Sequence, residues 1–262
     1  MGRLDDKVVI VTGAGEGLGR TMAELFSREG AKLVLAGRRR ELLDETRALV
    51  EAGGGVALVV PTDITDEAAV VDLVGTTVGE LGAVDVLCNN ASQPGTDLYL
   101  WEQTLDNWNG CIAAVVTGPM LCTREVLRQS MLERRSGSIV NFSSTASIDG
   151  FARKSHYTVA KSGLRLLTKT TAHEVGPFGI RCNCIVPGAI ETGLLHRYWN
   201  RVADERGVSV DIVREESTAA AALRKVASPD EVAQAALFLA SDESSAITGQ
   251  SIIVDAGQHM YG

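Results

Sequence analysis

The stretch KVVIVTGAGEGLGR, residues 7–20, decides the fold class. After Lys7 the run is continuously apolar up to Thr12, as in strands that are covered on both faces of a parallel sheet. Gly13, Gly17 and Gly19 follow at once, and glycine lets the backbone turn tightly where other residues cannot. A helical pattern begins near Leu18. The stretch therefore predicts a buried strand, a glycine-rich loop and a helix, in that order.

The same succession recurs along the rest of the chain. Apolar runs rich in Val, Ile and Leu alternate with helical stretches that include 17–29, 39–52 and 65–80. The predicted strands span 7–13, 32–37, 56–63, 84–90, 138–144, 180–188 and 251–257. Repeated strand–helix–strand units indicate an α/β fold, a doubly wound parallel sheet (Rossmann fold) of about seven strands with helices on both faces. Because no linker or internal repeat interrupts residues 1–262, we expect a single dinucleotide-binding and catalytic domain.

Composition and charge narrow the class of partner. Of the 262 residues, 45% are hydrophobic and 22% are charged, which is typical of a globular protein. The net charge of −8 argues against nucleic acid or an anionic membrane as a partner. The N-terminus lacks the apolar core of a signal peptide, and we expect no run of membrane-spanning length. Five scattered cysteines predict buried free thiols rather than a metal site or disulfides, and the chain is expected to be cytoplasmic.

The glycine-rich loop is the predicted pyrophosphate site. Its glycines allow the backbone to approach a phosphate closely, and the N-terminus of the following helix attracts negative charge. The spacing Gly-x-x-x-Gly-x-Gly differs from the more familiar Gly-x-Gly-x-x-Gly. The residues expected to contact the cofactor here are Gly13, Gly15, Glu16, Gly17, Leu18 and Gly19.

The end of the second predicted strand bears on the choice of cofactor. An enzyme that uses NAD usually places a carboxylate there to bind the ribose 2′-hydroxyl. This chain instead has Gly37 followed by Arg38, Arg39 and Arg40. Guanidinium groups bind phosphate well, so Arg38 and Arg39 favour a 2′-phosphate and hence NADP(H). Glu16 opposes this interpretation because its carboxylate would repel a phosphate, and NAD(H) stays possible.

A second constellation lies at residues 155–161, SHYTVAK. On a helix, Tyr157 and Lys161 are one turn apart and face the same side. A cation beside a phenol lowers the pKa of the phenol, so that it can exchange protons nearer to neutral pH. His156 points about 100° away from Tyr157 on such a helix and is expected to be a bystander.

Taken together, these motifs resemble the short-chain dehydrogenase/reductase family, in its single-domain type of about 250 residues. The resemblance rests on TGAGEGLG (12–19), NNA (89–91), NFSS (141–144), YTVAK (157–161) and PGAIET (187–192), and it covers nearly the whole chain. It implies a metal-free oxidoreductase that transfers a hydride between a nicotinamide cofactor and a secondary alcohol, ketone or aldehyde, and the arginines after the second strand favour NADP(H) as that cofactor. The catalytic residues it implies are Ser144, Tyr157 and Lys161. Tyr157 would be the general acid or base, Lys161 would stabilise the phenolate, and Ser144 would donate a hydrogen bond to the substrate oxygen.

The resemblance also implies further cofactor contacts. Besides Tyr157 and Lys161, these are Asp63, Ile64, Asn90, Ala91, Pro187, Gly188, Ile190 and Thr192. Asn90 is expected to brace the central strand, and Asp63 to contact the adenine ring. Family members are commonly oligomers, so a homotetramer is expected, with a dimer as the alternative.

Two positions depart from the family pattern. Ser92 stands where a glycine usually follows Asn-Asn-Ala, and Val115 stands where an asparagine usually helps to hold a water that links the lysine to solvent. The second departure leaves an alternative open: a nucleotide-binding protein with reduced or lost catalysis that acts as a sensor or binds a partner.

Residues 189–228 form the one irregular stretch, rich in charge and in bulky side chains such as Tyr198 and Trp199. Ligands bind beyond the carboxyl ends of strands in such sheets, so this stretch is the predicted substrate lid. Burial on one face of an amphipathic helix would explain the same side chains equally well.

Overall fold

All seven predicted strands form, and they join in one parallel sheet. The computed structural model describes residues 2–260. The strands are β1 (Val8–Thr12), β2 (Lys32–Gly37), β3 (Val56–Pro61), β4 (Val86–Asn89), β5 (Gly137–Phe142), β6 (Ile180–Pro187) and β7 (Ser251–Val254). Their order across the sheet is β3-β2-β1-β4-β5-β6-β7, and every neighbouring pair is parallel. The chain order reverses between β1 and β4, which is the point where doubly wound sheets bind their ligands.

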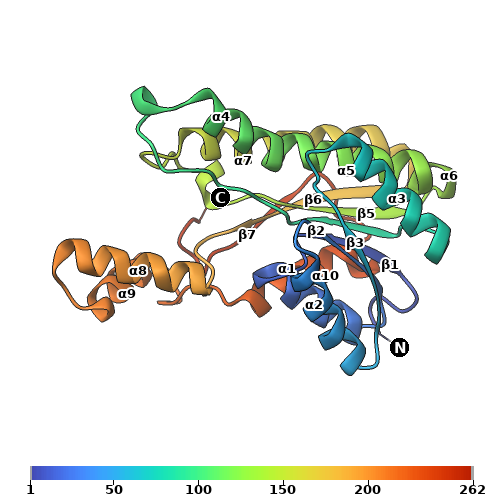
Figure 1. The fold of residues 1–262 in the computed structure, drawn as a ribbon, viewed down its shortest axis with the longest axis horizontal. Helices are drawn as coiled ribbons and strands as arrows, with labels where there is room; N and C mark the ends of the chain where they lie inside the picture. The colour runs from blue at the N-terminus through green and yellow to red at the C-terminus, as the bar shows by residue number, and fades with distance from the viewer. Residues whose placement is uncertain (1, 261–262) are drawn as a thin grey trace.

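Helices cover both faces of the sheet because successive strand residues point to opposite sides. In β1, Val9 and Val11 pack into one core layer, and Val8 and Ile10 pack into the other. The first layer is closed by α1 (Gly17–Arg28), α2 (Arg40–Ala52) and α10 (Pro229–Ala240). The second is closed by α3 (Glu67–Leu81), α5 (Gly118–Val126) and α7 (Ser155–Val175). Figure 1 shows these two helical layers above and below the sheet.

One long helical segment connects β4 to β5. It comprises α4 (Leu105–Ile112), α5 and α6 (Leu132–Arg134), joined by the π-helical turns η2 (Ala113–Thr117) and η3 (Leu127–Met131). By length and composition alone, Leu105–Arg134 is apolar enough to cross a membrane, which the sequence did not lead us to expect. In the fold, 56% of its most apolar window is buried. Packing against α3, α7 and the sheet therefore accounts for its apolar side chains.

The stretch 189–228 is helical, so the expectation of irregular structure was wrong. It contains α8 (Gly193–Arg206) and α9 (Val210–Ala219), which project from the body of the molecule (Figure 1). Trp199, Ala203 and Val213 form a small core of their own between the two helices. A bridge between Ile190 and Ala227 brings the two ends of the stretch together. The stretch is thus a helical hairpin, and its end is also bonded to the segment after β7, where the Leu223 N–H donates to the Ala256 carbonyl at 3.0 Å.

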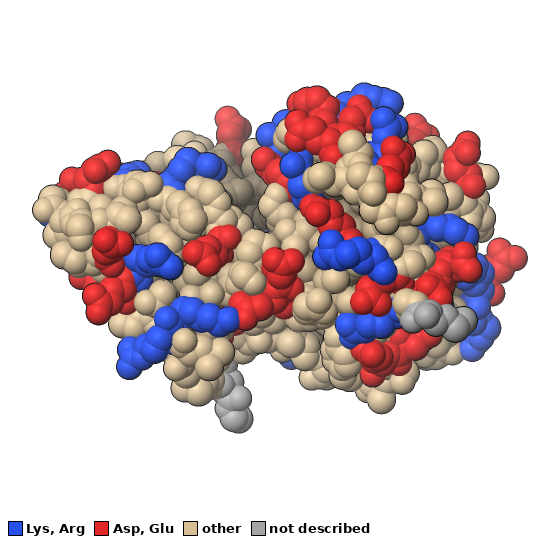
Figure 2. Space-filling model, turned by 90° about the horizontal axis from the view of Figure 1, so that it is seen from below, with Lys and Arg blue, Asp and Glu red and all other residues tan. Residues whose placement is uncertain are grey.

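Short 3-10 turns complete the chain: η1 (Leu100–Glu102), η4 (Thr145–Ser147), η5 (Gly176–Phe178) and η6 (Asp242–Ser244). Figure 2 shows acidic and basic side chains mixed over the lower face of the molecule.

Candidate active site

The carboxyl ends of the central strands place the predicted site residues along one edge of the sheet. Gly13 follows β1, Asn90 follows β4, Ser144 lies just beyond β5, and Gly188 follows β6. Since these strands are parallel neighbours, their carboxyl ends meet at the same edge. Tyr157 reaches this edge from the first turn of α7.

The glycine-rich loop has the shape that a bound pyrophosphate requires. Gly13 and Gly17 take φ values of +70° and +55°, which residues other than glycine rarely adopt. A Cβ on Gly19 would lie 2.1 Å from the carbonyl oxygen of Gly13, so only glycine fits there. At Gly17 an added Cβ would meet open space, which leaves room for a ligand. The side chain of the N-cap residue Glu16 does not cap α1, so the N–H groups of the first turn of α1 can bind a phosphate. The loop therefore fits a dinucleotide.

Glu16 and Arg39 form an ion pair across this loop. The pair neutralises the carboxylate that opposed a 2′-phosphate, and it also occupies one of the two arginines expected to bind it. Arg38 is exposed and lies close enough to Asp63 to help lower the pKa of that carboxyl, after the larger effect of hydrogen bonds from the Thr65 backbone N–H and hydroxyl. Asp63 is held in place by those bonds, at 2.9 and 2.7 Å from the Thr65 nitrogen and hydroxyl oxygen.

Ser144, Tyr157 and Lys161 come together at the edge of the sheet. The Ser144 side chain lies close enough to the Tyr157 hydroxyl to act on its pKa, and the Lys161 Nζ lies 5.6 Å from the centre of the Tyr157 ring. Ser144 also accepts a bond from the Ala146 N–H at 3.2 Å, which sets its place at the start of η4. Ser143 has a different task, because its hydroxyl donates to the Lys161 carbonyl at 2.8 Å. Of these two serines, Ser144 is therefore the one whose side chain acts on the phenol, and its catalytic role stays a prediction.

Burial sets the proton affinities of the phenol and the ammonium in the protein without a ligand. Burial raises the pKa of Tyr157 to about 12, although the nearby Ser144 side chain acts in the opposite direction. Burial lowers the pKa of Lys161 to about 8. The Lys161 Nζ donates to the Phe142 carbonyl at 2.7 Å, which partly replaces its lost hydration. The cation is thus held beside the phenol at an electrostatic cost.

Val115 lies beside this group, in the π-helical turn η2. It is buried in a small apolar cluster with Cys111 and Ala160, against which Tyr157 packs. The position is the one where the family resemblance expects an asparagine. Its side chain adds no polar atom near Lys161, so the departure from the family pattern is real in the fold as well as in the sequence.

Three further predicted residues lie between the site and the core of the fold. The Asn90 amide donates to the Thr12 and Gly13 carbonyls at 2.9 and 3.3 Å, and it thereby ties the end of β4 to the end of β1 and to the glycine-rich loop. The Ala91 N–H donates to the Thr12 hydroxyl at 3.0 Å. The Ile64 side chain is only 7% exposed and packs in the core, so it offers a cofactor no side-chain surface.

The remaining predicted contacts surround the base of the helical hairpin. Pro187 ends β6, and Gly188 approaches Asp255 so closely that a Cβ would lie 2.7 Å from the Asp255 Cβ. Ile190 forms the bridge to Ala227, and Thr192 precedes α8 without capping it.

Sequence reasoning did not anticipate the surroundings of His156, which was expected to be a bystander. Its ring is fully buried, and its two nitrogens contact Gln103 and Pro94. The polar pair Gln103 and Asn107, four residues apart, was the available signal, but nothing in the sequence indicated that it would meet His156.

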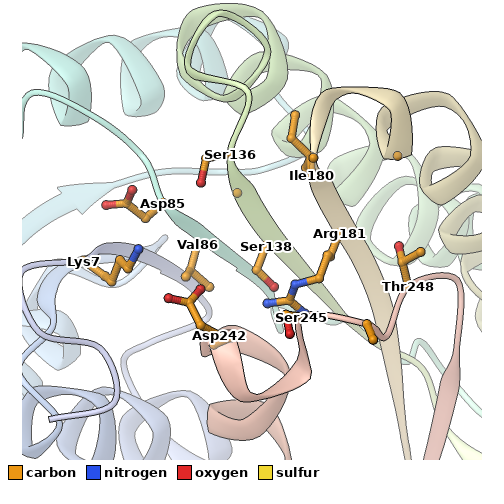
Figure 3. Close-up of a pocket in the computed structure, with 15 residues that line it drawn as sticks. Lys7, Asp85, Val86, Ser136, Ser138, Ile180, Arg181, Asp242, Ser245 and Thr248 are labelled. Carbon is orange, nitrogen blue, oxygen red and sulfur yellow. The ribbon is translucent and has the colours of Figure 1, made fainter.

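A separate cavity of about 330 Å³ lies at the opposite edge of the sheet (Figure 3). Lys7, Asp85, Ser138 and Arg181 line it, and these residues stand at the starts of β1, β4, β5 and β6. Parallel strands place this cavity away from Ser144 and Tyr157. Arg181 donates to the Leu239 and Ser241 carbonyls there, so it acts as a structural clamp.

Comparison with known proteins agrees with this geometry. A family model described as "Enoyl-(Acyl carrier protein) reductase" matches residues 13–259. The chain is 33% identical over 255 residues to meso-2,3-butanediol dehydrogenase of Serratia marcescens, which covers 97% of this chain and 95% of that protein. The crystal structure of levodione reductase superimposes with a TM-score of 0.91 at 32% identity, covering 97% of this chain and 98% of the other. The structure of NAD⁺-bound xylitol dehydrogenase gives a TM-score of 0.90 at 29% identity, with coverages of 97% and 99%.

Proposed function

The chain belongs to the short-chain dehydrogenase/reductase family, and on this premise we propose that it interconverts a secondary alcohol and a ketone (or an aldehyde) with NADP(H), using Tyr157 as the general acid or base. The closeness of Ser144 and Lys161 to the Tyr157 phenol carries this proposal, because Ser144 acts to lower the pKa of the phenol and the Lys161 Nζ lies 5.6 Å from the centre of its ring. When bound, the nicotinamide supplies or accepts the hydride. The glycine-rich loop and the first turn of α1 would hold its pyrophosphate.

The protein's own residues handle the proton. In the reducing direction the substrate carbonyl oxygen becomes an alkoxide, and Tyr157 donates a proton to it. Ser144 donates a hydrogen bond to the same oxygen and stabilises its developing charge. Lys161 stabilises the phenolate that remains. In the oxidising direction the phenolate takes the alcohol proton back.

Tyr157→Phe tests this assignment. The variant keeps the ring and its packing but has no exchangeable proton, so turnover is expected to fall by about 100-fold or more. Binding of NADPH, followed by fluorescence titration, is expected to stay close to that of the wild type. Failure of the wild type to turn over any member of a broad panel of alcohols and ketones, with either cofactor, would contradict the proposed activity.

The preference for NADP(H) rests on Arg38. Arg38 is exposed just after β2, at the sequence position where an NAD enzyme usually has a carboxylate, while Arg39 neutralises Glu16. Arg38→Ala is expected to weaken NADPH binding by about 10- to 100-fold and to leave NADH binding nearly unchanged, because only the 2′-phosphate contact is lost. Arg39→Ala is expected to weaken NADPH binding less, by exposing the Glu16 charge. A wild type that prefers NADH would overturn this part of the proposal.

Val115 favours a second candidate, a nucleotide-binding protein with reduced or lost catalysis. Its burial among apolar side chains leaves Lys161 without the amide that usually helps to hold a relay water. This candidate predicts cofactor binding without turnover. Hydride transfer that is abolished by Tyr157→Phe would exclude it.

A further inference from the structure

We infer that His156 is a positioning residue, which fixes the first turn of α7 and hence Tyr157 through a directed chain of hydrogen bonds to Gln103 and Asn107. The inference rests on the proposed role of Tyr157 in the reaction. His156 is 0% exposed and immediately precedes Tyr157 in the chain. Its ring points toward the segment that follows β4, whereas Tyr157 lies near Ser144, beyond β5.

The two ring nitrogens of His156 have partners of opposite kinds. Its Nε2 lies 2.8 Å from the Pro94 carbonyl oxygen, which can only accept a hydrogen bond. The Nε2 therefore carries the proton. In the neutral ring the Nδ1 is then an acceptor, and the Gln103 Nε2 lies 2.9 Å from it. The tautomer of His156 thus follows from its neighbours.

The orientation of the Gln103 amide is fixed in turn by Asn107. The Gln103 Oε1 accepts from the Asn107 Nδ2 at 2.5 Å. Asn107 is itself oriented by the backbone of Thr96, because its Oδ1 accepts from the Thr96 N–H at 2.8 Å and its Nδ2 donates to the Thr96 carbonyl at 3.0 Å. Reversing either amide would set two donors or two acceptors against each other. The chain from Thr96 to Pro94 therefore has one direction, with every member satisfied.

Gly95 shows how tightly this network is built. It takes a φ of +73°, and a Cβ there would lie 2.6 Å from the Asn107 Oδ1 and 3.0 Å from the His156 Nε2. Only glycine allows the backbone to pass between the two side chains.

The start of α7 depends on this attachment. Lys154, at the N-cap position, makes no side-chain cap, and the buried Ser155 hydroxyl has no hydrogen-bond partner among residues 2–260. Exposed contacts add to the attachment: the Leu98 N–H donates to the Arg153 carbonyl at 3.0 Å, and Lys154 pairs with Asp97 at 3.3 Å. His156 makes the buried contacts of this attachment. Without it the first turn, and with it the Tyr157 hydroxyl, is free to shift relative to Ser144.

Three substitutions at His156 test the inference. Phe keeps a ring but loses both bonds, so the kcat of His156→Phe is expected to fall by about 10- to 100-fold, as for other small displacements of a reacting group. Asn can replace the acceptor for Gln103, and Gln can replace the donor to Pro94. His156→Asn and His156→Gln are therefore expected to recover at least about three-fold in kcat over the Phe variant. The dissociation constant of NADPH is expected to stay within about two-fold in all three, because the glycine-rich loop is not involved.

Ser130→Ala is the control for a purely structural loss. Its hydroxyl is buried and bonds the Val84 backbone far from the site, so unfolding temperature is expected to fall without loss of kcat. Wild-type kcat in folded His156→Phe would overturn the inference. Asn and Gln variants no more active than Phe would overturn it too, as would an equal loss of kcat in the Ser130 variant.

Magnetic resonance separates a failure of this inference from a failure of the proposed function. In ¹⁵N-imidazole spectra the His156 ring, identified by its loss in His156→Phe, is expected to carry its proton on Nε2. The ¹³C resonances of the Tyr157 ring are expected to move in His156→Phe and to return toward their wild-type positions in the Asn and Gln variants. A proton on Nδ1, or Tyr157 resonances that do not move, would refute the positioning role even if no substrate is found.

Discussion

Lys161 is a cation that the fold buries before any ligand arrives. Among residues 2–260 its ammonium donates to one acceptor, the Phe142 carbonyl, and its burial lowers its pKa from 10.5 to about 8. A residue chosen for stability alone would not be charged at this position. Its presence beside Tyr157 is therefore best explained by chemistry, as is common where pKa values are strongly perturbed.

Lys161→Met is accordingly expected to stabilise the protein while it abolishes turnover. At pH 7 the gain in the free energy of unfolding is about 2 kcal/mol, after allowing for the hydrogen bond that the Phe142 carbonyl loses. Below about pH 8 the ammonium is charged in both folded and unfolded chains, so the cost of burying it is present in full. Between pH 8 and 10.5 the folded protein gives up this proton first, and the stability of the wild type rises with pH. The advantage of the variant over the wild type should therefore shrink across this range in urea unfolding curves, and an advantage that grows with pH would contradict this account.

Single residues also show where sequence reasoning succeeds and where it stops. Tyr157 and Lys161 were predictable because a helix brings residues four apart onto one face. The bond between His156 and Gln103 joins residues 53 positions apart, and the pair of Glu16 and Arg39 joins residues 23 apart. Such partners depend on how loops are placed on the finished sheet, which local spacing does not determine.

At the scale of elements, the glycine-rich segment tolerates no side chain at Gly19, where the first turn of α1 passes the Gly13 carbonyl. In Gly19→Ala the new Cβ would lie 2.1 Å from the Gly13 carbonyl oxygen, a clash of backbone with side chain that forces the loop apart. NADPH binding is expected to be lost or to weaken by about 100-fold or more, because the phosphate cradle is distorted.

Gly79→Ala is the matched control in α3. An added Cβ meets nothing within 4 Å there, so the substitution is expected to stabilise the helix by about 0.5–1 kcal/mol and to leave NADPH binding unchanged. Calorimetric titration with NADPH and thermal unfolding measure the two effects. Equal loss of binding in both variants would show that glycine content in general, rather than the crossing at Gly19, is what matters.

The sequence contains helix-boundary signals for the helical hairpin of α8 and α9, although its charged composition led us to expect irregular structure. Gly207, with a φ of +64°, ends α8, and the Ser209 hydroxyl caps α9. Both are ordinary helix-boundary signals. The charged composition of 189–228 obscured them, because the hairpin buries only a narrow stripe of apolar side chains in its own small core.

Trp199 holds this hairpin together. It is 3% exposed, and its indole N–H donates to the Ser217 hydroxyl at 3.1 Å. Trp199→Ala is expected to cost the hairpin about 3–5 kcal/mol of local stability, so that trypsin cuts α8 faster and the KM for the substrate rises while NADPH binding persists. Tyr198→Ala is the control, since Tyr198 is exposed beside it. If trypsin cuts both variants at the rate of the wild type, the hairpin is not held by this small core.

At the scale of the whole molecule, the two core layers follow from the apolar strands and were predictable, but the exposed apolar surface was not. Val159 and Leu166 are 49% and 65% exposed and stand seven residues apart on α7, so they lie on one helix face. β7 is an edge strand with half-buried Ile252 and Ile253. Apolar surface of this kind is commonly covered in an assembly.

We propose that α7 and β7 form contacts between copies of this chain in a homotetramer. Light scattering is expected to give four times the chain mass of 27.8 kDa for the wild type. Leu166→Glu places a charge on the proposed contact and is expected to yield a smaller species, because an unpaired charge is costly to bury. Leu49→Glu is the control, because Leu49 lies on α2 and is also exposed, at 47%. This variant is expected to leave the mass unchanged. A monomeric wild type would contradict the assembly itself. A variant Leu166→Glu that is still a tetramer would instead show that the copies meet through other surfaces. A glutamate buried at this position would weaken the binding between the copies.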